Sequence, residues 1–195
     1  MNRSTKIRYI IFQILIEIFK KNKNFNTIFE EKIAEHSFNQ NELSFINNVC
    51  LNSMRRSIHS KVILNKFAKK KLKTNEFVLL CSAIAQIVYL NIKPHAVVNE
   101  TVNVSKKIKV FPGFINAILK NILKNIHDVK KTEIRLRDFP EWFVNEIKKT
   151  KNINTHNFIH TFYKQPDLHI VFKSEKYLKK FTEENTKSSR KSTFL

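Results

Sequence analysis

The spacing of the apolar residues is the feature that most restricts how this chain can fold. Through the first 128 residues apolar side chains recur three and four positions apart, as at Ile7, Ile10, Ile11 and Ile14, and no segment alternates with a period of two. The first spacing lines one face of an α-helix, whereas a half-buried strand needs the second. This part of the chain is therefore expected to be all-α, a compact bundle of short helices.

Seven helices are expected before residue 128. Ser4 or Thr5 is available to cap the first, and Thr74 to cap the fifth, while Pro94 and Pro112 suit the first turn of the last two. Segment 77–90 is apolar almost throughout, which indicates a central helix touched on most sides. The apolar sets that define the seven helices span residues 7–18, 25–33, 43–54, 62–67, 77–90, 95–107 and 114–126.

The remaining third of the chain is less regular. Pro140 is expected to start another helix, and residues 167–173 alternate loosely, which is the one strand signal and predicts a small α+β C-terminal appendage. Residues from 176 onward are rich in Lys, Ser and Thr with little periodicity, so a mobile tail is expected. The predicted organisation is a helical domain over 1–129, a linker over 130–138, a second subdomain beginning over 139–175, and the tail over 176–195.

The balance of charge indicates a polyanionic partner. Lys and Arg number 36 against 16 Asp and Glu, a formal charge of +20, which favours nucleic acid or an anionic membrane as the partner. The longest apolar stretch has 14 residues, fewer than a bilayer-spanning helix needs, and no signal-peptide pattern opens the chain. Cys50 and Cys81 lie within apolar helical patterns and make no disulfide framework. We expect a cytoplasmic protein that does not bind membranes.

Two runs of sequence carry a resemblance to a known family. Residues 92–106 and 112–120 resemble the Ile-Pro-x-x-Ala-x-x-Asn-Glu-x-Val and Gly-Phe-Val-Asn-(Gly/Ala)-Val-Leu-Arg runs of NusB-like domains, although Lys120 stands where the family has Arg. Arg8 and the Met54-Arg55 pair also look like family positions. The resemblance implies a helical RNA-binding bundle. The matching positions are Ala96, Asn99, Glu100, Val102, Gly113, Phe114, Asn116, Ala117 and Leu119.

A second resemblance follows the first. Residues 139–143 and 163–168 look like the His-Pro-x-Trp and Asn-x-x-Pro-Pro-x-x-Leu-Arg elements of bacterial ribosomal RNA cytosine-5 methyltransferases, whose N-terminal domain is NusB-like. The resemblance covers about residues 5–173, up to the start of that family's catalytic domain. Methyl transfer would need a Gly-rich loop for S-adenosylmethionine and a Pro-Cys nucleophile, and this chain has one Gly and no Pro-Cys. We expect no catalytic residue, cofactor or metal in the chain.

The expected RNA-binding residues come from two sources. The resemblance implicates Lys6, Arg8, Phe114 and Asn116, because RNA and a ribosomal protein bind near these positions in the free-standing antitermination factor of the NusB-like family. Phe114 and Asn116 are equally well explained as structural. Clusters of basic residues on or beside amphipathic helices can neutralise phosphates jointly, although any single cluster is more readily explained as a solvated face. The clusters contribute Arg3, Arg55, Arg56, Lys69, Lys70, Lys106 and Lys120.

Other chemistry-bearing residues have a plain structural interpretation beside a functional one. For Cys50 and Cys81 core packing is favoured over a nucleophilic role, and for His156 and His160 a surface position is favoured over a shared metal. Trp142 is expected in the core, with stacking on a base as the alternative.

Four functions remain open at this stage. The favoured one is binding of ribosomal RNA by a module that itself does no chemistry. The alternatives are antitermination with a ribosomal protein on a nascent transcript, a part of a methyltransferase completed by a separate chain, and a basic scaffold for acidic surfaces.

Overall fold

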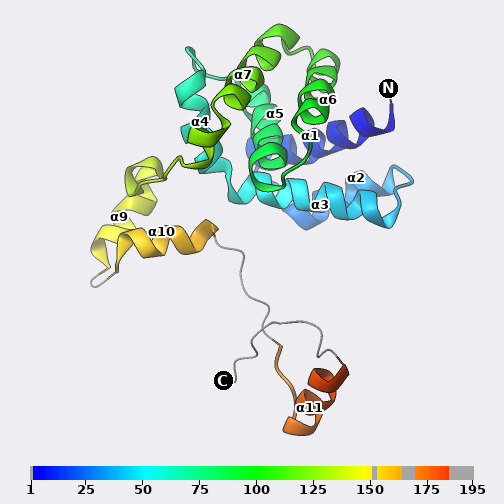
Figure 1. The fold of residues 1–195 in the computed structure, drawn as a ribbon, viewed down its shortest axis with the longest axis vertical. Coiled ribbons are helices and arrows are strands. Elements are labelled where there is room, and N and C mark those ends of the chain that lie inside the picture. The colour runs from blue at the N-terminus through cyan, green and yellow to red at the C-terminus, as the bar shows by residue number, and fades with distance from the viewer. Residues whose placement is uncertain (1, 151–152, 164–169, 185–195) are drawn as a thin grey trace. The chain divides into compact units, whose positions relative to one another are not determined.

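The described residues of the computed structural model, 2–150, 153–163 and 170–184, are helical and joined by short loops, with no strand among them (Figure 1). The chain divides into two compact units, Met1–Tyr163 and Lys164–Leu195. The first unit confirms the expected helical bundle. Its helices are α1 (Arg3–Lys21), α2 (Phe25–Ala34), α3 (Gln40–Arg55), α4 (Ser57–Phe67), α5 (Thr74–Ile84), η1 (Ala85–Tyr89), α6 (Pro94–Lys107), α7 (Pro112–Lys124), α8 (Ile126–Lys130), η2 (Leu136–Asp138), α9 (Glu141–Lys149) and α10 (Thr155–Tyr163).

Helix α5 lies at the centre of the bundle, as its continuous apolar sequence predicts. It packs against α1, α3, α4, α6 and α7, and all residues from Val78 to Ile84 are buried. Helix α1 turns Ile11, Ile14 and Leu15 into the same core at 0% exposure. Burial of each such side chain contributes about 1.5–3 kcal/mol. No helix in the described part of the chain is long and apolar enough to cross a membrane.

Two helix starts differ from the sequence-based expectation. Asn2, not Ser4 or Thr5, caps α1, because its Oδ1 accepts from the N–H of Thr5 at 2.7 Å. Helix α5 is preceded by Lys73 as N-cap, and the carboxylate of Glu76 accepts from the Lys73 N–H at 2.8 Å. In both cases the polar group that reaches an unpaired backbone donor decides the helix boundary.

The apolar segment 77–90 is not one regular helix. It changes at Ala85 to the π-helical turn η1, in which the N–H of Leu90 bonds to the carbonyl of Ala85 at 3.1 Å. Asn91 then ends the segment in the left-handed region at φ 51°. The wider turn sets the directions of Gln86 and Tyr89, both of which make contacts described below.

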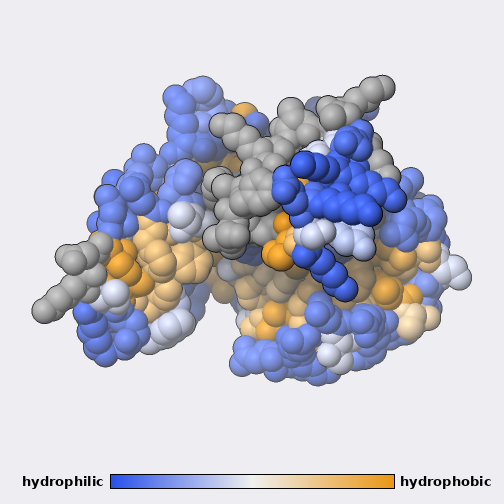
Figure 2. Space-filling model, turned by 90° about the horizontal axis from the view of Figure 1, so that it is seen from below, coloured by the Kyte–Doolittle hydropathy of each residue, from blue (hydrophilic) through white to orange (hydrophobic). Residues whose placement is uncertain are grey.

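Helices α9 and α10 extend the first unit beyond α8. Phe143 of α9 and Phe158 and Phe162 of α10 pack together with Phe139, which follows η2. The ring centres of these four residues lie within 6.3 Å of one another in five pairs. We call these four residues the phenylalanine cluster. At the left of Figure 2 hydrophobic residues gather on this part of the unit within a hydrophilic rim. The expectation that Trp142 lies in the core is wrong, because its side chain is 68% exposed.

The second unit contains α11 (Glu175–Glu184), within the segment expected to be a mobile tail. Phe172 packs against Phe181 with ring centroids 5.3 Å apart, and Lys179 pairs with Glu175 at 3.1 Å. The predicted α+β appendage is not supported: residues 170–173 form no strand, and residues 167–169 lie outside the described chain. An extended segment needs a neighbouring strand to satisfy its backbone, and the described residues offer none.

Candidate nucleic-acid interface

Exposed lysines gather where the 68–73 loop and the end of α6 approach the start of α7. Lys70 Nζ lies 4.4 Å from the ring centre of Phe114 in α7, which joins the loop to that helix. Across α6, Lys107 Nζ lies 3.9 Å from the ring centre of Tyr9 in α1. We call this group the lysine surface, and it consists of seven exposed lysines: Lys69, Lys70, Lys71, Lys73, Lys106, Lys107 and Lys109.

Carboxylates do little to offset this positive charge. Glu76 pairs with Lys70 at 3.3 Å and is itself only 7% exposed. Glu100 of α6 is also 7% exposed, and its carboxylate accepts hydrogen bonds from the side chains of Asn2 and Thr5. Since both carboxylates are buried or paired, the solvent-facing side of the lysine surface is dominated by ammonium groups.

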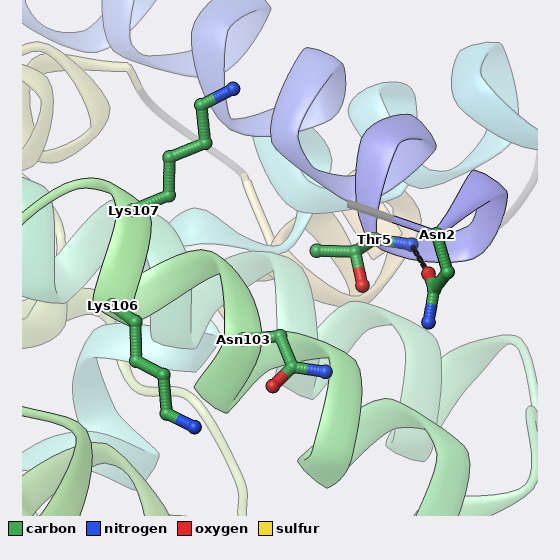
Figure 3. A pocket seen from close by; sticks show the side chains of 5 residues that line it. All are labelled: Asn2, Thr5, Asn103, Lys106 and Lys107. Carbon is green, nitrogen blue, oxygen red and sulfur yellow. Dashed lines mark hydrogen bonds between the residues drawn. The ribbon is translucent and has the colours of Figure 1, made fainter.

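An open pocket of about 450 Å³ lies at one end of the lysine surface (Figure 3). Asn2 and Thr5 at the start of α1 form one wall, and Asn103, Lys106 and Lys107 of α6 form the other. The sticks in Figure 3 show amide, hydroxyl and ammonium groups around this space. Such groups donate hydrogen bonds and positive charge, which is the chemistry that holds a phosphate.

Arg8 is held inside the bundle. Its Nε donates to Oε1 of Gln86 at 2.9 Å, its Nη1 donates to the hydroxyl of Ser4 at 2.6 Å, and its guanidinium lies 5.4 Å from the ring centre of Phe45. Burial lowers the pKa of Arg8, and the nearby charge of Glu100 partly opposes that shift. The side chain thus joins α1, α3 and η1, while a role in RNA binding stays a prediction.

Arg3 is paired, and Lys6 is half-buried. The guanidinium of Arg3 forms a two-pronged contact with Glu42, at 2.7 and 2.5 Å, and lies 5.2 Å from the ring centre of Phe38. That contact holds the pKa of Glu42 at about 2. Arg3 remains exposed, so it can meet a phosphate only in competition with Glu42.

The two adjacent arginines at the end of α3 have different surroundings. Arg55 is exposed, whereas Arg56 is half-buried between the rings of Tyr89 and Tyr163, at 4.8 and 4.9 Å. Arg56 also donates to the carbonyl of Tyr163. Burial raises the pKa of the Tyr163 hydroxyl to about 12, although the charge of Arg56 acts in the opposite direction. Arg56 therefore holds the end of α10 against the bundle.

The remaining expected residues lie on or next to α7. Phe114 is half-buried under Lys70, Asn116 is half-buried, and Lys120 is exposed two turns into the helix. Only part of the expected set therefore lies on the lysine surface. Lys70 contacts Phe114, Lys69 precedes Lys70 in the same loop and Lys106 lies in the last turn of α6, whereas Arg55 and Arg56 lie at the end of α3.

Phe111 belongs to this region but was not expected there. Its ring is 74% exposed, and a Cβ at Gly113 would lie 3.1 Å from two of its atoms. The single glycine of the chain thus leaves room for the Phe111 ring against the first turn of α7. Phe111 precedes α7, so the apolar spacing of that helix does not include it and gave no reason to expect it at this surface.

Three other residue sets can now be placed. Cys50 and Cys81 are 0% exposed in the core, as expected. His156 and His160 are exposed on α10. His59, which drew no attention in the sequence, is buried, with Nε2 2.7 Å from the carbonyl oxygen of Thr132 and Nδ1 bonded to the hydroxyl of Tyr89.

Comparison with known proteins gives one family and three relatives. The NusB family model matches residues 5–124. Ribosomal RNA small subunit methyltransferase B of Pasteurella multocida is 25% identical over 149 residues, covering 73% of this chain and 33% of that protein. The probable enzyme of the same name from Coxiella burnetii is 29% identical over 122 residues, covering 58% of this chain and 28% of that protein.

The third relative covers the largest share of this chain among the three. Ribosomal RNA small subunit methyltransferase B of Cronobacter sakazakii is 22% identical over 158 residues, covering 76% of this chain and 36% of that protein. The chain therefore spans about a third of the length of each relative.

Proposed function

The chain belongs to the NusB family, and from this premise we propose that it binds ribosomal RNA through the lysine surface. The observation that carries the proposal is the group of seven exposed lysines beside two buried carboxylates. Ammonium groups that neutralise phosphates release counterions, which supplies affinity with little dependence on base sequence. The names of the relatives supply the choice of ribosomal RNA as the ligand.

The pocket beside α1 extends this proposal to a defined phosphate position. Lys106 and Lys107 supply positive charge, and the amide of Asn103 can donate to the same space, whereas the hydroxyl of Thr5 is already engaged with Glu100. A phosphate seated there fixes where the RNA backbone passes α1 and α6.

Methyl transfer is assigned to residues outside this sequence. The sequence has no Pro-Cys pair and a single Gly, so the proposal gives it the binding step only. A catalytic domain, in the same protein or in a separate chain, acts on the RNA that this module holds.

The test is equilibrium binding of the chain to a small-subunit ribosomal RNA fragment and to a scrambled RNA of equal length, across a salt series. In the test variant Lys106, Lys107 and Lys109 become Gln. The matched control replaces Lys20, Lys61 and Lys93 by Gln; these lysines are also exposed but lie on α1, on α4 and at the opposite end of α6. Both variants lose three charges, so a difference between them reports position rather than net charge.

We expect the test variant to bind more weakly and to lose about 2 from the slope of log K against log salt, at about 0.7 per single-strand phosphate contact. The control variant should keep most of the slope. Equal effects of the two variants, or equal binding to heparin and RNA, would leave only a basic scaffold. Antitermination remains the alternative, and preference for a leader transcript over the ribosomal fragment would favour it.

A further inference from the structure

Trp142 is exposed although it lies on a helix, α9, that packs an apolar face against the rest of the unit. Helix α9 turns Phe143 and Ile147 inward, where both are half-buried, while Trp142 is 68% exposed. Successive residues of a helix point about 100° apart, so the indole projects beside the buried face rather than into it. A large aromatic side chain in that position leaves apolar surface in water.

The indole of Trp142 packs against the phenylalanine cluster through Phe143. Its ring centre lies 5.7 Å from that of Phe143, with the ring planes at 89°. Phe143 in turn stacks on Phe139 at 4.9 Å and packs edge-to-face with Phe162 at 5.6 Å. The perpendicular contact with Phe143 can cover at most one face of the indole, and the 68% exposure of Trp142 leaves indole surface on which a flat ligand can stack.

Exposed arginines lie on the short helix that packs against α9, the helix of Trp142. Helix η2 packs against α9, and Arg135 and Arg137 at η2 are exposed. The sequence from residue 130 to residue 149 contains six Lys and Arg residues and four Asp and Glu residues. Two of the carboxylates are engaged, Asp138 with the N–H of Arg135 at 2.8 Å and Glu146 with Lys149 at 2.7 Å. Proteins that bind single-stranded RNA combine basic residues that meet the phosphates with aromatic rings on which bases stack, and η2 and α9 together carry both kinds of residue.

Trp142 also lies outside the part of the chain that matches the NusB family. That match ends at residue 124. An alignment covering 76% of the chain takes in about 148 of its 195 residues and therefore includes Trp142 wherever it begins. Position 142 is thus aligned with a protein named as a ribosomal RNA methyltransferase.

We propose that Trp142 is a stacking platform for an unpaired base of bound RNA, and this inference rests on the proposed RNA-binding function. The lysine surface holds phosphates without regard to pairing, whereas an exposed indole takes only a base that has left its duplex. Trp142 therefore gives the module a preference for single-stranded RNA that lysines alone do not provide.

The chain contains one Trp, so its fluorescence reports on this site alone. The experiment titrates the full chain with an unstructured 12-nucleotide oligouridylate and with a 12-base-pair RNA duplex. Indole emission follows stacking, and the anisotropy of a labelled copy of each RNA follows total binding. The variants are Trp142→Ala, Trp142→Leu and Trp142→Phe, with Tyr177→Ala as control because Tyr177 is 59% exposed and lies in the other unit.

We expect the oligouridylate to quench the indole strongly and the duplex to quench it weakly. Trp142→Ala and Trp142→Leu should bind the oligouridylate about tenfold more weakly, while Trp142→Phe and Tyr177→Ala stay near the parent. The salt slope should be the same in all four variants, because stacking releases no counterions. Circular dichroism checks that each variant is folded.

The outcomes separate this inference from the function on which it rests. Saturated RNA binding by anisotropy with unchanged indole emission, or Trp142→Leu binding as tightly as the parent, overturns the stacking role and points to a protein partner on α9. If the parent chain binds neither RNA, the proposed function itself is overturned. A lowered salt slope in Trp142→Ala would show that the substitution disturbs phosphate contacts rather than stacking.

Discussion

Nε of Arg8 donates a hydrogen bond to Oε1 of Gln86 at 2.9 Å, between residues 78 positions apart in the sequence. Gln86 is 1% exposed, and its amide nitrogen also donates to the carbonyl of Ser82 at 3.1 Å. The bond joins the first helix to the π-helical turn at the end of the central helix. Arg8 thereby contributes to stability, whatever it contributes to RNA binding.

We expect Arg8→Ala to lower the free energy of unfolding by about 2–3 kcal/mol, because it leaves the buried Gln86 oxygen without this donor. Chemical denaturation of parent and variant measures the difference. The control is Arg55→Ala, which removes an exposed arginine of α3 and should change stability by less than about 0.5 kcal/mol. Equal stability of the Arg8 variant and the parent would contradict the structural role.

Protonation of His59 should destabilise the fold. Burial lowers the pKa of His59 from 6.5, with smaller contributions from the charges of Arg56 and Lys66, and the bond to the Thr132 carbonyl partly opposes the shift. The unfolded chain therefore takes up a proton at higher pH than the folded chain. The stability from neutral His59 is present above about pH 6.5 and is lost as the pH falls below that value.

The measurement is the free energy of unfolding between pH 7.5 and pH 5. In the parent His59 should contribute a slope of up to about 1.4 kcal/mol per pH unit in the acidic part of this range. His59→Gln should be less stable at neutral pH but lose less on acidification. A variant with the parent's full pH slope would assign the effect to other groups.

Arg56 should control the attachment of α10. Its guanidinium lies between the rings of Tyr89 and Tyr163, and each such contact contributes about 0.5–1 kcal/mol or more where partly desolvated. We expect Arg56→Ala to raise the rate of amide hydrogen exchange in α9 and α10 while the exchange of α1 and α5 stays slow. Arg55→Ala is the matched control. Uniform acceleration through the whole unit would indicate global destabilisation instead.

Both thiols should be unreactive in the folded chain. Burial raises the pKa of Cys50 and raises that of Cys81 to about 12, and both side chains are 0% exposed. Reaction with a disulfide reagent requires an accessible thiolate. We expect both thiols to react rapidly in denaturant. In native buffer at pH 8 they should react only as fast as the chain unfolds. Rapid reaction of one thiol in native buffer would contradict the core positions.

The sequence by itself determined the helical architecture of the first unit. Apolar spacing is a local property, so it correctly indicated α1, α3, α5, α6 and α7 and the central place of α5. The seven lysines were also visible as charge clusters, because lysines beside an amphipathic face remain in solvent. The prediction of a strand over 167–173 was wrong for residues 170–173, the part that the structure describes. Loose alternation over so few residues carries little information without a partner strand.

Only the tertiary structure decided which polar groups are already engaged and which aromatic ring is free. In the sequence Arg8 and Arg56 are basic residues beside amphipathic helices, as Lys106 is. In the structure, however, Arg8 bonds to Gln86, and Arg56 lies between Tyr89 and Tyr163. Trp142 has the spacing of a core residue but projects into solvent. These outcomes depend on contacts between segments far apart in the chain, and the periodicity of one helix does not show what the packing of its neighbours leaves open.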